Sequence, residues 1–376
     1  MSDRDAAAVA IQGFEQAVTD TEAAKTWEPV SDRKIRVGIA GYGVCAFGAA
    51  FHFQDHPNVT VAAVADLDPD KCAELSKLCR CETMYSSCEE LIGDASLEAI
   101  FIATDAPSHG RLAIAALEAG VHVASAVPAV FGSLEEADTL FAAVKTAGCK
   151  YMMFETSYFH DDLYCMREMY KTGALGKVVY AEGEYWHYFD TPLAAHKGWR
   201  TGLPPQWYPT HSNAYYVGVT GGSFTEVSCM GMPSPLDHLK PENNQYSNPF
   251  GTEIALFRTS EGGMARMEVS WDTPGEGGER GRIRTQQGTY YGEFQSHQKD
   301  HVPPAIVRPP LPPGVEAGGH GGSHGYLMAE FVEAILLDRN PLVDVAQSLN
   351  MTVGGIVAHQ SALKDGELMK IPQYSL

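Results

Sequence analysis

A glycine-rich turn placed directly after a β-branched run is the feature that most constrains what this chain can fold into. Residues 35–40 have the composition of a buried strand, and they are followed by Gly41-Tyr42-Gly43-Val44-Cys45-Ala46, a G-x-G-x-x-A pattern. In such a turn the first glycine allows a tight reversal, the second lets the backbone approach a pyrophosphate, and the small last residue lets helix and strand pack closely. The pattern predicts a dinucleotide-binding unit, with a merely structural glycine turn as the alternative.

The end of the second expected strand indicates which dinucleotide binds. The run 59–66 ends at Asp66, where a carboxylate accepts hydrogen bonds from the adenosine ribose hydroxyls. Leu67-Asp68 follows, at the place where an NADP-binding chain would carry an arginine for the 2′-phosphate. We therefore expect NAD as the cofactor.

The first part of the chain alternates between strand-like and helix-like segments, which is typical of a doubly wound parallel sheet covered on both faces. The expected strands are 35–40, 59–66, 99–104, 121–125 and 151–155, and the expected helices lie near 45–55, 69–78, 109–119 and 133–147. We therefore expect an α/β chain with a Rossmann domain over residues 34–154. An N-terminal extension, residues 1–33, precedes it and has weak helical periodicity over 6–26.

Beyond residue 155 strands follow strands, which predicts an α+β domain with a mostly antiparallel, open sheet. The expected elements are strands at 178–188, 224–230, 252–259, 264–271 and 289–294, and helices near 161–172, 326–338 and 344–363. The Gly-rich segment 273–288 and the Pro-rich segment 303–313 are expected to be loops. We expect residues 155–376 to form a substrate-binding domain whose last helices pack back on the body, since Leu327, Phe331 and Ile335 follow a helical spacing.

Charge and composition limit the partners of the chain. The 27 basic and 47 acidic residues give a net charge of −20, and such a surface repels both nucleic acid and anionic lipid headgroups. No apolar run is long enough to cross a bilayer and the first residues do not resemble a secretion signal, so we expect a cytoplasmic protein. The eight cysteines are spread thinly, and Cys72, Cys79, Cys81 and Cys88 lack the paired spacing of a zinc site, so we expect reduced thiols and no metal.

Short motifs spread over both expected domains point to one family. They are Ala103-Thr104-Asp105-Ala106-Pro107-Ser108-His109, the AGVHV segment 119–123 and the GALGKV segment 173–178. From Lys34 onward the chain resembles the glucose-fructose oxidoreductase / inositol dehydrogenase / MocA (Gfo/Idh/MocA) family. Dehydrogenases of that family carry Glu-Lys-Pro after the His-Val strand, with the lysine beside nicotinamide and substrate, whereas this chain reads Ala126-Val127-Pro128. The family's aspartate four residues before the substrate-domain histidine is also missing, because Trp207 precedes His211 at that distance.

The same departures resemble one branch of the family, the NAD-dependent glycosidases typified by α-N-acetylgalactosaminidases. The segments that match this branch are Val127-Pro128-Ala129, EGEYWH at 182–187, YPTH at 208–211 and GHGG at 319–322. Two places depart from it: residues 155–158 are one residue shorter than the branch's Glu-x-x-x-Tyr segment, and Ala126 replaces a glutamate.

The resemblance implies a set of site residues. It makes His211 the group that takes the hydroxyl proton and Tyr158 a second base, which its surroundings must activate. It implies that the residues in contact with the sugar are Tyr185, His187, Arg200, Tyr208 and His320. The cofactor contacts that we expect are Gly41, Tyr42, Gly43, Val44, Cys45, Asp66, Thr104, His109, Val127 and Pro128.

Three functions follow from these patterns. The leading expectation is an NAD-dependent enzyme that oxidises a sugar ring hydroxyl, with net glycoside cleavage by oxidation, elimination, hydration and reduction. A simple NAD-dependent sugar or polyol dehydrogenase is the first alternative. A non-catalytic NAD-binding sensor or corepressor is an alternative of another class, raised by Val127 in place of lysine. The expected partners are a small carbohydrate or glycoside and further copies of the chain, joined through the open face of the C-terminal sheet.

Overall fold

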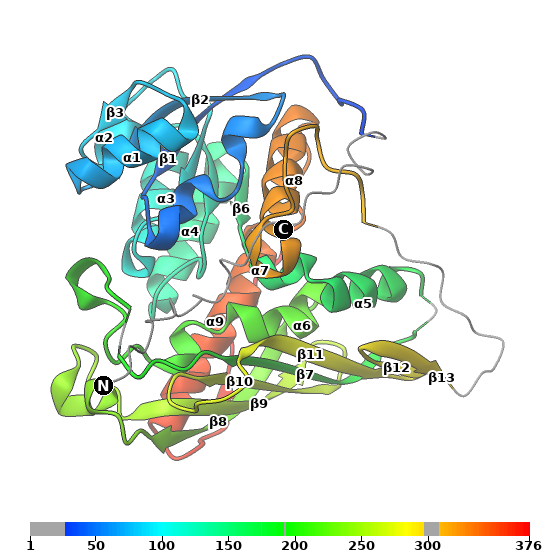
Figure 1. The fold of residues 1–376 in the computed structure, drawn as a ribbon. Coiled ribbons are helices and arrows are strands. Elements are labelled where there is room, and N and C mark those ends of the chain that lie inside the picture. The colour runs from blue at the N-terminus through cyan, green and yellow to red at the C-terminus, as the bar shows by residue number, and fades with distance from the viewer. Residues whose placement is uncertain (1–26, 174, 192, 297–307) are drawn as a thin grey trace, which may run out of the picture.

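The structure is a computed structural model that describes residues 27–173, 175–191, 193–296 and 308–376. The predicted helical segment 6–26, Ala174 of the GALGKV motif and positions 303–307 of the expected Pro-rich loop lie outside the described residues. Figure 1 shows two sheets stacked one above the other, with helices between them and beside the upper sheet. No helix in the described ranges is long and apolar enough to cross a membrane.

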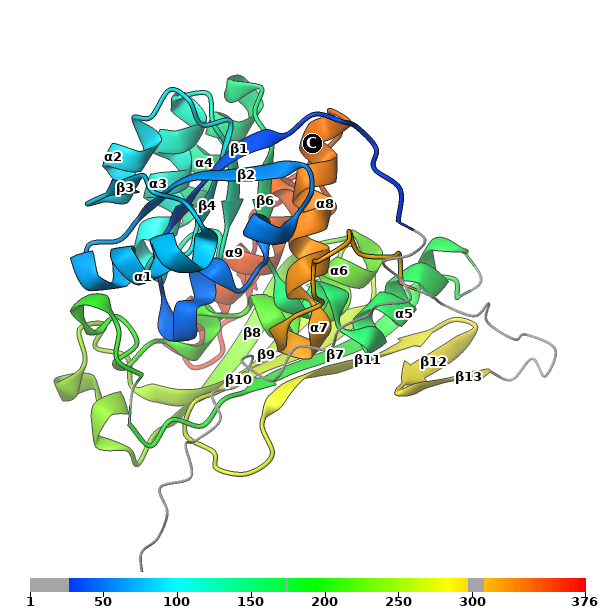
Figure 2. The ribbon, with the colours of Figure 1, turned by 45° about the horizontal axis from the view of Figure 1, so that its top comes forward.

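The first sheet is parallel and has six strands in the order β3-β2-β1-β4-β5-β6. The strands are β1 (Ile35–Ala40), β2 (Val59–Ala65), β3 (Met84–Tyr85), β4 (Ala99–Ile102), β5 (His122–Ser125) and β6 (Tyr151–Met153). The helices are α1 (Pro69–Cys79), α2 (Cys88–Ile92), α3 (His109–Glu118) and α4 (Leu134–Ala147). The predicted doubly wound parallel sheet is confirmed, and Figure 2 shows its helices on both faces.

Local signals explain where these helices begin and end. The Asp68 carboxylate accepts hydrogen bonds from the backbone N–H groups of Asp70 and Lys71, and Pro69 occupies the first helical position of α1. Ser133 caps α4 in the same way, and Gly148 ends that helix in the left-handed conformation. Each connection is therefore short, so the carboxyl ends of the strands all reach one edge of the sheet.

The helix predicted near 45–55 is wrong. The chain instead makes two 3-10 turns, Val44–Ala49 and Phe53–Asp55, separated by His52 in the left-handed conformation. Cys45 and Ala46 also have positive φ angles, 50° and 59°, so they interrupt any α-helix at its start. The buried rings of Phe51 and Phe53 stack against the aromatic core below, and packing of these rings overrides the local helical propensity.

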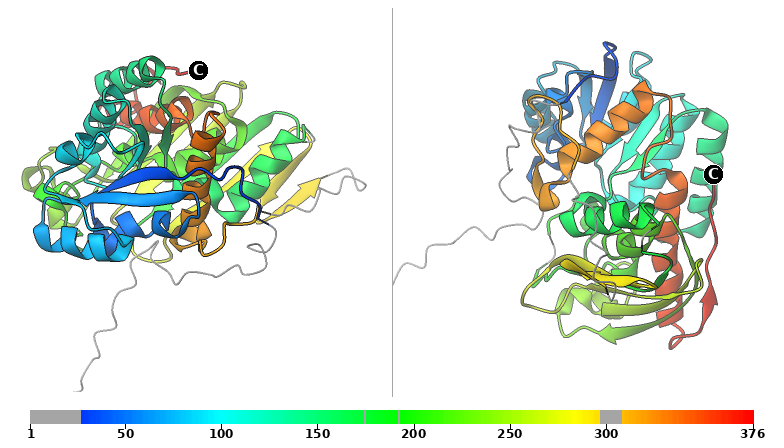
Figure 3. Two further views of the ribbon diagram at one scale, coloured as in Figure 1. Left: turned by 90° about the horizontal axis from the view of Figure 1, so that it is seen from above. Right: turned by 90° about the vertical axis from the view of Figure 1, so that its right-hand side faces the viewer.

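The second sheet has eight strands in the order β13-β12-β11-β7-β10-β9-β8-β14. Its strands are β7 (Val178–Trp186), β8 (Phe224–Pro233), β9 (Phe250–Thr259), β10 (Met264–Ser270), β11 (Gly278–Thr285), β12 (Gly288–Tyr291), β13 (Glu293–Ser296) and β14 (Met369–Lys370). Within this sheet only the β7–β10 pair is parallel among the pairings of its described strands, which confirms a mostly antiparallel sheet. One face carries helices and the other lies open, as the right-hand view of Figure 3 shows.

Five helices accompany this sheet: α5 (Asp161–Lys171), α6 (Thr210–Thr220), the short α7 (Gly319–Gly322), α8 (His324–Leu336) and α9 (Val345–Ala362). Helix α6 packs so closely on β7 that a Cβ atom at Gly183 would lie 2.1 Å from the carbonyl oxygen of Ser212. Helix α9 contacts β8 and α6 of the second sheet as well as α4 and β6 of the first. The predicted packing of the final helices on the body is confirmed, because Leu327 and Phe331 are fully buried.

Three expectations for this half of the chain need correction. The segment 273–288 contains strand β11 rather than only a loop, and the single strand predicted at 289–294 is a hairpin, β12 and β13, that turns at Gly292 with φ 70°. Helix α6 was missed altogether. Every residue from Thr210 to Val219 is buried, so this helix has no polar face and shows no helical periodicity.

Candidate active site

A cleft of about 690 Å³ runs between the carboxyl edge of the parallel sheet and the helix-bearing side of the second sheet. Thirteen of the predicted site residues line it. They are Gly41, Gly43, Val44, Asp66, Thr104, His109, Val127, Tyr185, His187, Arg200, Tyr208, His211 and His320. The expected cofactor residues and the expected substrate residues therefore share one cavity.

At one end of the cleft the glycine turn is built for close approach by a ligand. Gly41 and Gly43 have φ angles of 97° and 69°. A Cβ atom at Gly41 would lie 2.5 Å from the carbonyl oxygen of Ala103. The carboxylate of Asp66 accepts hydrogen bonds from the backbone N–H groups of Tyr42, at 2.7 Å, and Asp68, at 2.9 Å. These contacts fix the carboxylate at the mouth of the cleft, and the residues present fit the adenosine half of NAD.

His109 joins the two loops that border the middle of the cleft. Its Nδ1 lies 3.1 Å from the carbonyl oxygen of Pro128 and its Nε2 lies 3.2 Å from that of Thr104. Burial lowers the pKa of His109, so the ring is neutral at neutral pH. A neutral imidazole carries one N–H, so at any moment one of the two carbonyls accepts its hydrogen bond.

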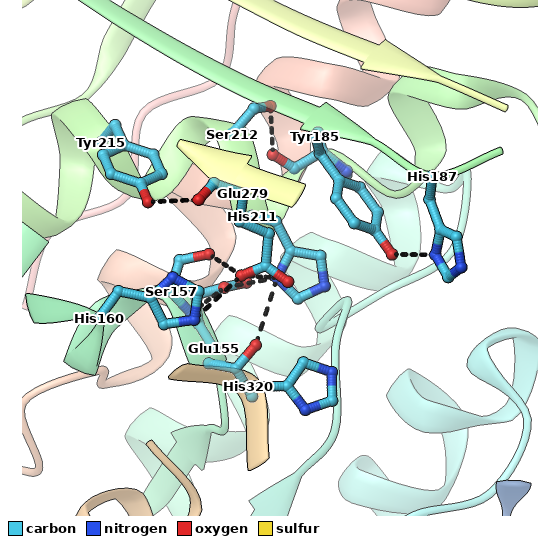
Figure 4. A network of polar contacts seen from close by, with 12 residues as sticks. Glu155, Ser157, His160, Tyr185, His187, His211, Ser212, Tyr215, Glu279 and His320 are labelled. Carbon is cyan, nitrogen blue, oxygen red and sulfur yellow. Dashed lines mark hydrogen bonds and ion pairs between the residues drawn. The ribbon is translucent and has the colours of Figure 1, made fainter. Parts of the chain in front are cut away.

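At the other end of the cleft His211 lies between two buried carboxylates (Figure 4). Its Nδ1 is 2.7 Å from Oε1 of Glu155 and 3.6 Å from Oε2 of Glu279. Glu155 follows β6 of the parallel sheet, whereas Glu279 lies on β11 opposite Tyr185 of β7. The missing aspartate before His211 is thus replaced by two glutamates from other elements.

The two carboxylates set the protonation state of the cluster. Burial alone would lower the pKa of His211, but the charges of Glu155 and Glu279 raise it to about 9. Burial alone would raise the pKa of Glu279, but the neighbouring His211 and His160 lower it to about 2. At neutral pH His211 is therefore an imidazolium that donates its Nδ1 proton to Glu155, and Glu279 is ionised.

Smaller polar groups hold the carboxylates in place. The backbone N–H of Ser157 donates to Glu155 at 2.9 Å, and the Ser157 hydroxyl donates to Glu279 at 2.5 Å. Nε2 of His160 lies 3.4 Å from Glu279. Sequence analysis had not assigned a role to Glu155, Ser157, His160 or Glu279. Glu155 and Ser157 belong to a motif already noted, whereas Glu279 was hidden in the segment taken for a loop.

Glu155, His211 and Glu279 also offer ligand atoms that all lie within 4.8 Å of one another, the spacing of a small metal site. The 2.7 Å contact between His211 and Glu155 has the length of a charge-assisted hydrogen bond. A proton on Nδ1 occupies the lone pair that a metal would need. We therefore describe this group as an ion-pair cluster.

Aromatic residues and one arginine build the substrate end of the cleft. The hydroxyl of Tyr185 lies 3.0 Å from Nδ1 of His187, and the Tyr185 ring is centred 4.6 Å from the His211 ring. The guanidinium of Arg200 lies 4.2 Å from the ring centre of Trp199, which stacks on Tyr208 at 6.2 Å. Burial, followed by the charges of Arg200 and His211, lowers the pKa of His187 to about 4. Trp199 was not among the predicted site residues.

Tyr158 does not reach the cleft, and its predicted role as a base needs correction. The residue is 2% exposed, and the Arg167 guanidinium lies 3.9 Å from its ring centre. Burial raises the pKa of Tyr158, so at neutral pH less of it is phenolate than for a free tyrosine. The 3-10 turn Thr156–Phe159 points Thr156 into the cleft and buries Tyr158 on the far side.

Three expected cofactor residues also lie outside the lining of the cleft. Tyr42 contributes its backbone N–H to Asp66, and Pro128 contributes its carbonyl to His109. Cys45 is exposed and has no role that the geometry supports.

The NAD-binding part of the chain matches a known family. Residues 35–155 match the family described as "Oxidoreductase family, NAD-binding Rossmann fold", GFO_IDH_MocA. The expected resemblance and the expected cofactor are therefore confirmed for this domain.

Curated relatives carry the name of one glycosidase family. A glycosyl hydrolase family 109 protein of Shewanella amazonensis is 25% identical over 69% of this chain and 63% of its own length. A protein of the same name from Saccharopolyspora erythraea is 21% identical over 91% of this chain and 83% of its own. The match to a Bacteroides fragilis relative spans 35% of that protein, so the chain covers less than two thirds of several of these relatives.

Solved structures share the fold of both domains. Levoglucosan dehydrogenase in complex with NADH and levoglucosan has a TM-score of 0.71 and 18% identity, over 91% of this chain and all of that one. Myo-inositol 2-dehydrogenase from Lactobacillus plantarum has a TM-score of 0.68 and 19% identity, over 90% of this chain and all of that one. At this identity the likeness shows that the Gfo/Idh/MocA domain and the open sheet share one known arrangement.

The glycine turn gives a first prediction. Replacing Gly41 with Ala places a Cβ atom against the carbonyl oxygen of Ala103 at a position with positive φ, so the turn must move away from the pyrophosphate site. We expect the Kd for NADH, measured by fluorescence titration, to rise at least about tenfold. Gly262→Ala is the matched control, because Gly262 has φ 87° and no atom within 4 Å of the added Cβ. Equal NADH affinity in the two variants would contradict the assignment of this turn.

Proposed function

We propose that this chain is an NAD-dependent enzyme that interconverts a carbohydrate hydroxyl and the corresponding ketone. The observation that carries this proposal is the cleft itself, in which the dinucleotide turn at Gly41 and the carboxylate-paired His211 line the same cavity. The names of the relatives and the dehydrogenase neighbours support a carbohydrate as substrate. The intact His211 cluster is why we propose an enzyme rather than a non-catalytic sensor.

In this proposal some residues of the chain bind the sugar and another transfers the proton. Bound NAD supplies the hydride acceptor for oxidation. His211 takes the hydroxyl proton in oxidation and returns it in reduction, while Glu155 and Glu279 keep the ring in one orientation. Val127 has no titratable group, so His211 is the proton-transfer group that we assign to this cleft. Tyr185, His187, Arg200, Tyr208 and His320 are the residues that we propose to contact the sugar.

The pKa of His211 gives a pH prediction. Oxidation needs the neutral ring, and its fraction grows as the pH rises toward about 9, so kcat/KM for oxidation should rise over the same range. In Glu155→Gln the lost charge no longer favours the imidazolium, so the rise should move to lower pH. His211→Asn should lose roughly 10²- to 10⁴-fold in rate and most of this pH dependence, while it keeps its affinity for NADH.

A second buried pair provides the control for this pH experiment. Nδ1 of His359 lies 2.7 Å from Glu253, in the same arrangement as His211 and Glu155 but outside the lining of the cleft. Glu253→Gln should therefore leave the position of the pH rise unchanged. If the profile of kcat/KM against pH does not move in Glu155→Gln, or moves equally in Glu253→Gln, the proton-transfer role of His211 is contradicted.

Glycoside cleavage is a second proposed function, favoured by the name of the curated relatives and by the Val127-Pro128-Ala129 and YPTH motifs. It requires a base for the carbon-bound proton after the ring hydroxyl is oxidised. Tyr158 was expected to be that base, and its burial away from the cleft makes this route weaker than simple dehydrogenation.

One assay separates the two functions. Purified protein is incubated with aryl glycosides without added cofactor and then with free sugars and NAD. Cleavage by hydride cycling releases the aryl group without accumulation of NADH, whereas dehydrogenation forms NADH in proportion to the sugar consumed. From the geometry we expect NADH formation from a sugar and no aryl release. Aryl release that Tyr158→Phe abolishes would instead support the cleavage route.

We also propose that copies of the chain associate through the open face of the eight-stranded sheet. No described helix covers this face in Figure 3, and it carries exposed Met230, Leu256 and Met264 at 60%, 47% and 48%. Exposed apolar side chains on neighbouring strands favour association. Sedimentation analysis should give a dimer or larger assembly for the wild type and a smaller species for Leu256→Glu. A wild-type monomer at high concentration would contradict this proposal.

A further inference from the structure

The substrate half of the cleft has an unusual set of side chains. From residue 154 onward, its lining consists of Phe154, Thr156, Tyr185, His187, Leu193, Ala194, Ala195, His196, Lys197, Trp199, Arg200, Tyr208, His211 and His320. None of these described lining residues is Asp, Glu, Asn or Gln. This half of the cleft therefore offers hydrogen-bond donors and cations but no carboxylate or amide oxygen from a side chain.

The overall composition of the chain does not explain why these described lining residues include no acidic side chain. The chain has 47 acidic and 27 basic residues, so a random sample of its surface would be acidic. The carboxylates that line the cleft are Asp66, Asp68, Glu89 and Asp105, and all four belong to the dinucleotide-binding half. The described lining residues from 154 onward thus include the cations Lys197 and Arg200 and no acidic side chain, and a positive field attracts an anion.

Arg200 is the strongest donor in this half. Within the described parts of the chain it forms no ion pair with a carboxylate, although most of the other described arginines do. Its guanidinium lies over the Trp199 ring at 4.2 Å and near the Tyr208 ring at 5.7 Å, and these rings orient its planar face. The guanidinium also hydrogen-bonds to the Tyr208 side chain, and its remaining N–H groups are left for a ligand oxygen.

The negative charges near Arg200 do not cancel the attraction of its guanidinium for an anion. Glu155 and Glu279 lie outside the lining of the cleft, and both contact the protonated His211. His187 also faces the cleft, and burial lowers its pKa, as do the charges of Arg200 and His211, whereas the charge of Glu279 raises it.

We infer that the carbohydrate bound here carries an oxyanion, a carboxylate or a phosphate, and that Arg200 holds it. The inference rests on the proposed function and names the substrate class of the same cleft. The described lining residues from 154 onward include no carboxylate or amide oxygen, so their only side-chain acceptors for the hydroxyls of a neutral sugar are tyrosine and threonine hydroxyls and neutral imidazole nitrogens. An oxyanion only accepts, and therefore matches a lining of arginine, lysine, tyrosine and histidine groups.

The test compares matched sugars on the protein saturated with NADH. Calorimetry measures the Kd values of D-glucuronate, D-galacturonate, D-glucose 6-phosphate, D-glucose and D-galactose. We expect at least one anionic sugar to bind roughly tenfold or more tightly than its neutral counterpart, and we expect added salt to reduce the difference. A preference for the uronates identifies a carboxylate, and a preference for the phosphate ester identifies a phosphate.

Arg200→Gln should weaken binding of the favoured anion by roughly 10- to 100-fold, because it removes a charge-assisted pair of hydrogen bonds. The Kd for NADH should stay within about twofold of wild type, and the Kd values for the neutral sugars should change much less than that for the anion. Arg258→Gln is the matched control, since Arg258 pairs with Glu226 on the open sheet face and should change none of these values.

Three results would overturn the inference. Neutral sugars that bind as tightly as the anions would show that no oxyanion is recognised, and so would the failure of every anionic sugar to bind. An equal loss of NADH affinity in Arg200→Gln would place the guanidinium on the cofactor instead. Oxidation of a neutral sugar with NADH formation, together with no binding of the anions, would leave the proposed function standing and remove only this inference.

Discussion

The hydrogen-bonded ion pair between His211 and Glu155 is the contact on which the arrangement of the cleft depends. Glu155 follows the last strand of the parallel sheet, and His211 stands in the first turn of α6, which covers the antiparallel sheet. Both side chains are almost completely buried, so neither charge can be satisfied by water if its partner moves. Removing one partner of such a pair costs about 3–5 kcal/mol, because the other charge stays buried and unpaired. The pair therefore fixes the position of the proposed proton-transfer group relative to the dinucleotide-binding sheet.

Much of the first domain could be predicted from the sequence because each strand ends in a recognisable signal. The G-x-G-x-x-A turn, Asp66 at the end of β2 and the caps at Asp68 and Ser133 all act over a few residues. Signals of this kind are visible without knowledge of the fold. The segment 45–55 was mispredicted because buried phenylalanine rings, whose partners are distant in sequence, decide its conformation.

The second domain was harder to predict because its key elements lack a periodic pattern. Helix α6 is buried on all sides, and β11 begins in a Gly-rich segment that reads as a loop. The consequence for the site was specific. His211, Tyr185 and Arg200 could be named from motifs, whereas Glu279 reaches His211 only through the pairing of β11 with β7. Tyr158 was assigned to the cleft from a motif that is one residue shorter in this chain. The 3-10 turn that follows Glu155 directs the Tyr158 side chain away from the cleft.

Helix α9 has a consequence for how the cleft can work. None of its described residues lines the cavity, yet it contacts α4 and β6 of the parallel-sheet domain and α6, which carries His211. Sixteen of its eighteen residues are buried, so it is a closely packed helix that joins the two sheets. Any change in the spacing between the two halves of the cleft would therefore have to break the packing of α9 against one of the two sheets.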